Sequence, residues 1–185
     1  MTWREDLATG IALEEVGDVE AALDIYFMTM IDPHLGAGRT EVELHLLAAL
    51  VRLDRKDEAL ANAGPVARTF REHGDREGAL ACTRIVTAAA PMSAEAWFDL
   101  ATDFKALGRL PEALDAVARC VALEPAQGDG WYNLACYRAL VGDTDGALEA
   151  LGLAVRIAPA NARLAVDDAD FATIRSDPRF LAATA

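Results

Sequence analysis

The segment AEAWFDLATDFKALG at residues 94–108 is followed, one fixed interval later, by GDGWYNLACYRALVG at residues 128–142. When the two segments are aligned through their tryptophans, the matching positions all lie 34 residues apart. These pairs are Trp97 and Trp131, Leu100 and Leu134, Ala101 and Ala135, Gly108 and Gly142, Ala113 and Ala147, Val117 and Leu151, Cys120 and Ala154, and Pro125 and Pro159. A period of this length indicates a chain built from repeated structural units.

A third copy of the pattern lies upstream, where matching residues again precede their counterparts by 34 positions. They are Val66, Ala67, Phe70, Gly74, Ala79 and Pro91. Ala63 stands at the tryptophan position of this copy, and Pro65 falls within its first predicted helix. That proline either sits in the first turn of a short helix or kinks a longer one.

Each unit is predicted to be a pair of helices. One face of the first helix carries Trp97, Leu100, Ala101 and Phe104, at the spacing i, i+3, i+4 and i+7. Gly108 is predicted to end this helix in the left-handed conformation, where a side chain would cost energy. Pro111 suits the start of the second helix, and Pro125 prevents that helix from continuing.

Small residues are predicted at the point where the two helices cross. Ala101 and Ala113 would allow the helix axes to approach, whereas larger side chains would push them apart. Two helices cannot bury such apolar faces alone, so each pair must stack on its neighbours. The segment therefore recurs because each copy forms one wall of the next copy's core.

These residues resemble the tetratricopeptide repeat family, whose signature is W-x2-L-G-x2-Y, then A-x3-F, then a proline on a 34-residue period. The chain reads Trp97-x2-Leu100-Ala101-x2-Phe104, Ala113-x3-Val117 and Pro125, then Trp131-x2-Leu134-Ala135-x2-Arg138, Ala147-x3-Leu151 and Pro159. Alanine replaces the signature glycine in both units, and Arg138 replaces a tyrosine. The resemblance implies an all-α fold, a right-handed α-solenoid of stacked antiparallel helix hairpins with a C-terminal capping segment.

The predicted organisation has three repeats at 60–93, 94–127 and 128–161, followed by a capping segment at 162–185. The run DADFATIRSDPRF in that segment resembles tails that close such arrays. Apolar residues predicted to cover the last repeat are Leu164, Phe171, Ile174 and Phe180. Residues 1–59 are predicted to form divergent helical repeats or, alternatively, a separate N-terminal helical cap. A loop is expected at 32–40.

The charge balance argues against nucleic acid and membrane partners. Seventeen basic and 30 acidic side chains give a net charge of −13, which phosphate backbones and anionic lipid surfaces repel. The acidic excess has a simpler role as well, because it keeps an alanine-rich surface soluble.

The compartment is predicted to be the cytoplasm. The opening residues MTWREDLATG lack the apolar stretch of a secretory signal, and no apolar run is long enough to span a bilayer. The cysteines at 82, 120 and 136 form no CxxC pair, which favours reduced thiols over disulfides or a zinc site. We expect neither a cofactor nor a bound metal.

Catalysis finds little support in the sequence. His34, His45 and His73 are scattered, and the chain contains no HExxH, glycine-rich phosphate loop or GxSxG motif. The sequence therefore predicts a protein that is not an enzyme.

The family resemblance implies that the first helices of successive repeats line a groove that receives a peptide or a partner helix. The predicted partner-binding residues are Phe98, Asp99, Thr102, Lys105, Tyr132, Asn133, Cys136 and Leu140. Phe98 and Tyr132 are the candidate anchors, because aromatic side chains supply large contact areas. Alternatively, both pack between neighbouring first helices. Asn133 either hydrogen-bonds a peptide backbone or is simply solvated.

The sequence favours a non-catalytic adaptor or scaffold whose partner segment is neutral or basic. A lysine, arginine and asparagine clamp for chaperone tails is not favoured, because only Asn133 fits it. The alternative is a structural homo-oligomer that assembles through its own repeat surfaces, with an apolar stripe near Leu7, Ile11 and Leu13 as the open end. The chain is accordingly expected to be a monomer or a weak homo-oligomer.

Overall fold

The computed structural model describes residues 2–32, 34–35 and 38–185, which divide into two compact units, Met1–Pro91 and Met92–Ala185. Unit 1 consists of α1 (Trp3–Glu15), α2 (Val19–Met30), α3 (Arg39–Arg52), α4 (Lys56–Glu72) and α5 (Arg76–Ala89). Unit 2 consists of α6 (Ala94–Ala106), α7 (Leu110–Leu123), α8 (Gly128–Leu140), α9 (Thr144–Ile157), α10 (Ala160–Asp167), the 3₁₀ helix η2 (Ala169–Phe171) and α11 (Pro178–Ala183).

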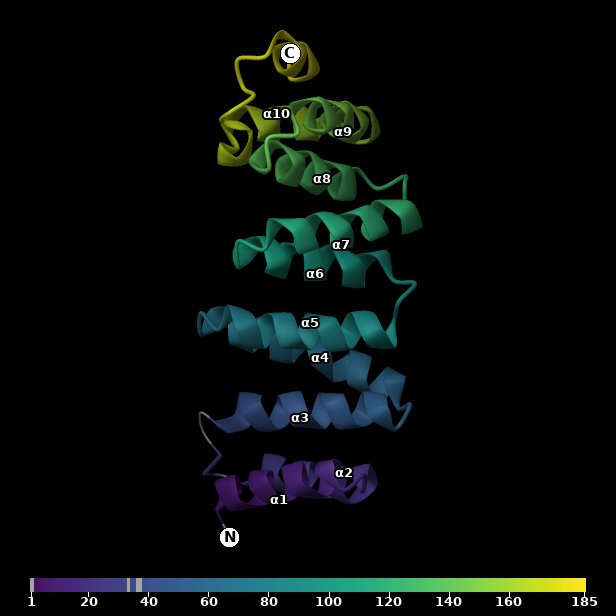
Figure 1. The fold of residues 1–185 in the computed structure, drawn as a ribbon, viewed down its shortest axis with the longest axis vertical. Helices are drawn as coiled ribbons and strands as arrows, with labels where there is room; N and C mark the ends of the chain where they lie inside the picture. The colour runs from purple at the N-terminus through teal and green to yellow at the C-terminus, as the bar shows by residue number, and fades with distance from the viewer. Residues whose placement is uncertain (1, 33, 36–37) are drawn as a thin grey trace. The chain divides into compact units, whose positions relative to one another are not determined.

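No strand occurs among these residues, and successive helices pack as hairpins (Figure 1). The prediction of an all-α fold of antiparallel helix hairpins is therefore confirmed. The repeat limits at 60–93, 94–127 and 128–161 stay predictions. The boundary between the two compact units lies two residues before the predicted start of the repeat at 94–127.

Glycine makes the turns inside the hairpins possible. Gly17, Gly74, Gly108 and Gly142 have φ angles of +87°, +75°, +73° and +84°, a region that disfavours residues with a Cβ atom. The residue after each glycine donates its N–H back across the turn, as Arg109 does to the Phe104 carbonyl at 2.9 Å. This bond satisfies a carbonyl that the helix end would otherwise leave without a partner.

Alanine lies at the centre of both hairpins of unit 2. The α6–α7 pair buries Ala101 and Ala113 completely, and the α8–α9 pair does the same with Ala135 and Ala147. The tryptophans of the repeat are less buried than their place on the predicted core face suggests. Both are half-buried: Arg119 lies 5.8 Å from the centroid of the Trp97 ring, and Trp131 donates its indole N–H to the Pro125 carbonyl at 3.0 Å.

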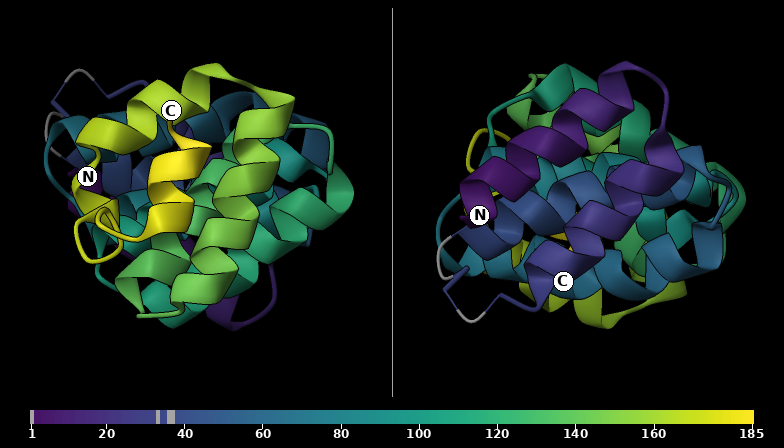
Figure 2. Two further views of the ribbon diagram at one scale, coloured as in Figure 1. Left: turned by 90° about the horizontal axis from the view of Figure 1, so that it is seen from above. Right: turned by 90° about the horizontal axis from the view of Figure 1, so that it is seen from below.

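Unit 1 contains a helix, α3, that belongs to neither of its two hairpins. The hairpins are α1–α2 and α4–α5, and α3 packs against α2, α4 and α5 (Figures 1 and 2). The turn after α3 repeats the glycine-type geometry without a glycine, because Asp54 has a φ of 58°. This extra helix explains why the 34-residue register is lost before residue 60.

Pro65 and the predicted loop at 32–40 both lie in unit 1. Pro65 lies inside α4, so the longer helix is formed and not a short one that begins near the proline. Residues 33, 36 and 37 of the predicted loop at 32–40 lie outside the described residues. The end of that predicted loop is wrong, because Arg39 and Thr40 already belong to α3.

The apolar stripe near the N-terminus faces the core of unit 1. Leu7 is 5% exposed, and Ile11 and Leu13 are partly buried against the cluster that it joins. The stripe on which the oligomer alternative was based is therefore turned inward.

The end of the chain covers the last hairpin of unit 2. Phe171, Ile174 and Phe180 are buried as predicted, and α10 and α11 both pack on α9 (Figure 2). The prediction for Leu164 is wrong: its side chain is 59% exposed, because α10 instead turns Asn161 and Ala165 inward.

We expect Ala101→Leu to lower the free energy of unfolding by about 1–3 kcal/mol, because extra methylene groups at a completely buried crossing force the helices apart. Chemical denaturation followed by circular dichroism measures this change. Ala118→Leu, on the exposed side of α7, is the matched control and should change stability by less than about 0.5 kcal/mol. Equal effects of the two substitutions would contradict the packing described for Ala101.

Candidate partner-binding site

The eight predicted partner-binding residues all lie on α6 and α8 of unit 2. Asp99 and Thr102 are exposed, Phe98 and Asn133 are half-buried, and Leu140 is 40% exposed. Burial raises the pKa of the Tyr137 hydroxyl on α8, and the nearby Thr102 side chain on α6 lowers that pKa.

Tyr132 is held by the C-terminal segment. Its hydroxyl donates to Asp168 Oδ2 at 2.8 Å, and its ring meets the ring of Phe171 edge-on at a centroid distance of 5.7 Å. Asp168 is fixed in turn, since its other carboxylate oxygen accepts the backbone N–H of Asp170 at 2.9 Å. Tyr132 therefore connects α8 to the C-terminal capping segment, residues 162–185, which we call the cap.

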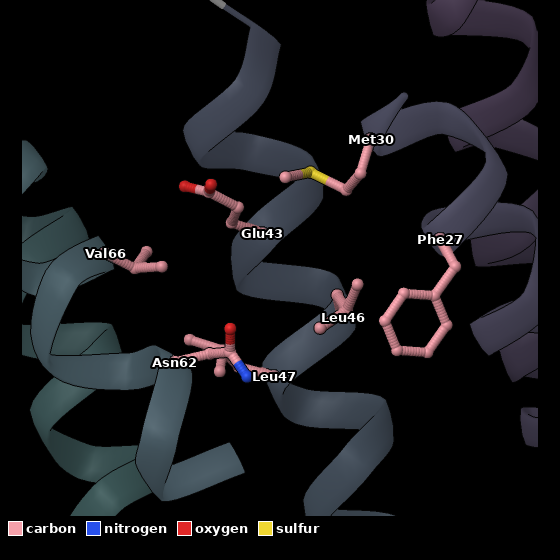
Figure 3. A pocket seen from close by; sticks show the side chains of 7 residues that line it. All are labelled: Phe27, Met30, Glu43, Leu46, Leu47, Asn62 and Val66. Carbon is pink, nitrogen blue, oxygen red and sulfur yellow. The ribbon is translucent and has the colours of Figure 1, made fainter. Parts of the chain in front are cut away.

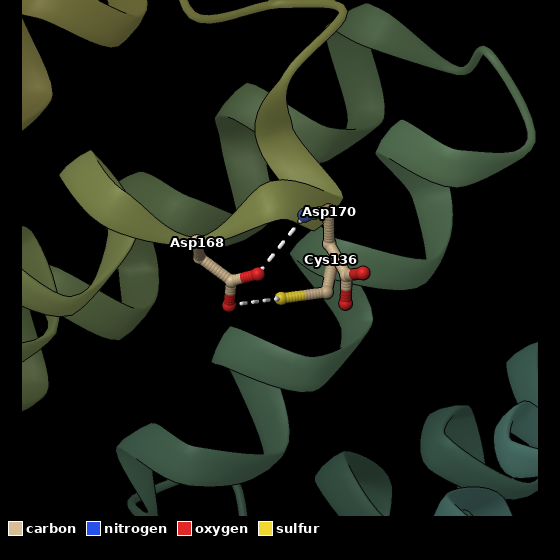
Figure 4. A group of neighbouring side chains, drawn as sticks. All are labelled: Cys136, Asp168 and Asp170. Atoms are coloured by element: carbon tan, nitrogen blue, oxygen red, sulfur yellow. Dashed lines mark hydrogen bonds between the residues drawn. The ribbon is translucent and has the colours of Figure 1, made fainter.

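Lys105 and Cys136 are also engaged by the C-terminal segment. The Lys105 ammonium lies 2.8 Å from Asp170 Oδ2. The Cys136 thiol, which is 2% exposed, lies 3.8 Å from Asp168 Oδ2 (Figure 4). The Lys105 side chain remains 38% exposed and Tyr132 is half-buried, whereas a partner would reach the buried Cys136 only if the cap moved. Their role in partner binding stays a prediction.

The environment keeps Tyr132 and Cys136 neutral. Burial raises the pKa of the Tyr132 hydroxyl, and its hydrogen bond to Asp168 raises it further. Burial likewise raises the pKa of the Cys136 thiol, with the negative charges of Asp168 and Asp170 acting in the same direction. Because the thiolate is the reactive form of cysteine, Cys136 is unsuited to nucleophilic chemistry.

Cys136, Asp168 and Asp170 form a group whose possible metal-ligand atoms all lie within 4.8 Å of one another. Their hydrogen-bonding does not fit a metal ion. Lys105 already supplies a positive charge to Asp170, the Tyr132 hydroxyl occupies Asp168, and the thiol is held in its protonated form. A metal would require a thiolate and carboxylates that are available to it. The contacts fit a structural joint between α8 and the cap.

Acidic side chains mark the ends of the surface that the cap leaves open. Glu95 and Asp129 are exposed in the first turns of α6 and α8, where negative charge is favourable for the helix dipole. Asp99 adds a third exposed carboxylate one turn further along α6. Thr102 and Asn133 add uncharged polar side chains to this surface.

The histidines lie outside this surface. His45 Nδ1 lies 3.8 Å from Glu14 Oε2 in unit 1, a contact between distant helices that sequence spacing did not reveal. His73 Nδ1 lies 2.7 Å from the Thr69 carbonyl at the end of α4, and the His34 backbone N–H donates to Asp32. The His34 and His73 contacts are local, and the His45 contact joins α3 to α1; each involves a single histidine.

Asp168 and Asp170, which contact three of the predicted site residues, were not predicted from the sequence. The available signal was the run DADF, which places two carboxylates and an aromatic residue together in a segment already identified as a cap. It did not show which face of α8 this segment would cover.

No family model matches the chain, and no curated protein matches it. Solved structures do match. A crystal structure of MamA is 20% identical, with 95% of this chain and 90% of that chain covered and a TM-score of 0.55. YrrB, described as a TPR protein with an unusual peptide-binding site, is 20% identical, with coverage of 86% and 89% and a TM-score of 0.51.

Another MamA structure, from MSR-1, is 21% identical over 85% of this chain and 95% of that chain, with a TM-score of 0.51. At identities this low, the structural matches show a shared fold and nothing further. The described residues also contain no helix that is both long and apolar enough to cross a membrane.

We expect Tyr132→Phe to loosen the cap, because it removes the hydroxyl that donates to Asp168 and keeps the ring that contacts Phe171. The loss of a hydrogen bond to a carboxylate should cost about 1–2 kcal/mol and raise the alkylation rate of Cys136 roughly 5- to 30-fold. Mass spectrometry after iodoacetamide pulses measures this rate at each cysteine.

Cys120 is the internal control, since it is 3% exposed on α7, away from the cap, and should react at its original rate. Unchanged alkylation of Cys136 in the variant would mean that the Tyr132–Asp168 contact does not hold the cap in solution.

Proposed function

We propose that this chain, which has the tetratricopeptide repeat fold, is a non-catalytic adaptor that binds a neutral or basic segment of a partner protein on α6 and α8. The observation that carries the proposal is the surface left open beside the cap. It presents the half-buried ring of Phe98 next to the exposed side chains of Asp99 and Thr102.

The chemistry of this surface suits an extended or helical peptide. Phe98 and Leu140 offer apolar area, and partly exposed aromatic side chains often contribute much of the binding energy at protein interfaces. The amide of Asn133 can both donate to and accept from a peptide backbone. Such a surface binds a segment along its length and requires no chemical step.

Charge favours a partner segment without acidic residues. Glu95, Asp99 and Asp129 are exposed on the two helices, while the ammonium of Lys105 is paired with Asp170. The net charge of −13 acts in the same direction over longer distances. An acidic peptide would be repelled, and a basic one would be attracted.

We place the adaptor in the cytoplasm. Cys82, Cys120 and Cys136 are buried thiols, which suit a reducing compartment.

Selection from a library of random peptides displayed on phage tests the proposed function. We expect enrichment of apolar peptides that are neutral or basic, and we expect Phe98→Ala to weaken binding of the selected peptides by roughly tenfold or more, as loss of an aromatic anchor does. Asn133→Ala should have a smaller effect in the same direction. Fluorescence anisotropy with labelled peptides measures both.

Asp115→Ala is the control variant, because Asp115 is exposed on α7, outside the proposed surface. It should leave peptide affinity nearly unchanged. Peptides that bind all variants equally would show that this surface is not the binding site. If Phe98→Ala unfolds the protein by circular dichroism, Phe98 belongs to the core and its assignment as an anchor is wrong.

A further inference from the structure

A second surface of interest lies in unit 1, where α2, α3 and α4 enclose a pocket of about 130 Å³ (Figure 3). We call it the α2–α4 pocket. Its apolar walls are formed by Phe27, Met30, Leu46, Leu47 and Val66. Small-molecule sites usually exceed about 300 Å³, so this volume suits one side chain of a partner better than a free metabolite.

The polar groups of the α2–α4 pocket are both able to accept hydrogen bonds. Glu43 contributes a carboxylate whose side chain is 19% exposed, and Asn62 contributes an amide. The amide nitrogen of Asn62 already donates to the Glu58 carbonyl at 2.7 Å, which leaves its oxygen as the acceptor. A pocket with apolar walls and two acceptors matches a side chain with an aliphatic stem and a cationic end.

The charge of Glu43 is only loosely matched within the chain. Arg39 Nη1 lies 3.6 Å from Glu43 Oε1, which is longer than a charge-assisted hydrogen bond. Arg39 is 52% exposed, and its Nη2 also reaches the Met30 carbonyl at 3.4 Å. An incoming cation can therefore compete for Glu43 without breaking a tight ion pair.

The end of α2, which supplies Phe27 and Met30 to the pocket, carries further exposed apolar side chains. Phe27 is 41% exposed, and its neighbours on and just after α2, Met28 and Ile31, are 66% and 73% exposed. Large apolar side chains concentrated this way commonly mark a protein interface. A segment that inserts one side chain into the pocket beside Phe27 can therefore extend along the end of α2.

We propose that the α2–α4 pocket receives a lysine or arginine side chain carried by an amphipathic segment of a partner protein. The stem of that side chain lies against Leu46, Leu47 and Val66, and its cationic group binds Glu43 and the Asn62 oxygen. Basic side chains readily bury their methylene stems while keeping the charged end on a polar group. Apolar residues flanking the lysine or arginine cover Phe27, Met28 and Ile31.

This inference depends on unit 1 alone and stands apart from the surface on α6 and α8. It names a recognition element, an inserted basic side chain, that the proposed function does not require. A neutral apolar side chain would fill the walls and desolvate the Glu43 carboxylate further while leaving it only the 3.6 Å contact with Arg39, which is unfavourable. An acidic side chain would be repelled.

The test uses two short helical peptides that share a leucine-rich face and differ at one position, lysine in one and norleucine in the other. Fluorescence anisotropy with the full chain should show the lysine peptide binding about tenfold or more tightly, the scale expected of a partly buried charge-assisted hydrogen bond. Glu43→Gln should remove this preference, because it keeps the shape of the side chain and deletes its charge.

Glu43→Gln is expected to fold normally. Burial raises the pKa of the Glu43 carboxyl and Arg39 opposes that shift, so folding favours the neutral form. The protonated Glu43 carboxyl therefore stabilises the fold at pH values below its pKa in the unfolded chain. This stabilisation is lost as the pH rises through its higher pKa in the folded chain. At neutral pH the charged side chain costs stability, and glutamine avoids that cost.

Matched variants separate the pocket from the overall charge. Glu41→Gln makes the same change on the exposed side of α3 and should retain the preference for lysine. Arg39→Gln removes the competing cation and should strengthen binding of the lysine peptide several-fold, whereas Arg68→Gln, exposed on α4, should change it little. Phe98→Ala in unit 2 should have no effect on either peptide.

The proposal is overturned if the lysine peptide shows no binding at about 1 mM, or if it binds no better than the norleucine peptide. Equal losses in Glu43→Gln and Glu41→Gln would also overturn it, because they would assign the effect to net charge. The α6–α8 adaptor function would survive each of these results, since its selected peptides are tested with different variants.

Discussion

The whole arrangement depends on how closely two helices of a hairpin can approach. Ala101 and Ala113 in one hairpin, and Ala135 and Ala147 in the next, are completely buried at positions where a larger side chain would separate the axes. Glycine turns such as Gly108 then return the chain at once, so the two apolar faces of a hairpin meet. Close approach of the paired helices is therefore the constraint that fixes the period of the sequence.

A hairpin packed in this way leaves one apolar face without a neighbour at the end of unit 2. Phe171 and Phe180 cover it, and the same segment places Asp168 and Asp170 over α8. Covering the hairpin thus engages Tyr132, Lys105 and Cys136 in contacts with the C-terminal segment. The proposed partner surface is what remains, around Phe98 and Asn133.

Much of the fold could be predicted because it repeats. The positions of Ala101, Gly108 and Pro125 recur at a fixed interval, and each has a local physical reason. The limits of that reasoning lie where contacts are made between distant segments: the period could not predict α3, or that Asp168 would cover Tyr132. The α2–α4 pocket was missed for the same reason, because Val66 lies in the predicted repeat at 60–93 whereas Glu43 belongs to α3, which lies outside the repeated register.

Amide hydrogen exchange on the unmodified chain, resolved residue by residue, tests the central claim most directly. The account predicts that the slowest amides in unit 2 cluster around the buried alanines of α6, α7, α8 and α9, since exchange there requires a hairpin to separate. The amides of α10, whose Leu164 side chain is exposed, should exchange faster. Exchange at Ala101 and Ala135 as fast as in α10 would contradict the account, because the crossing points would then not hold the hairpins together.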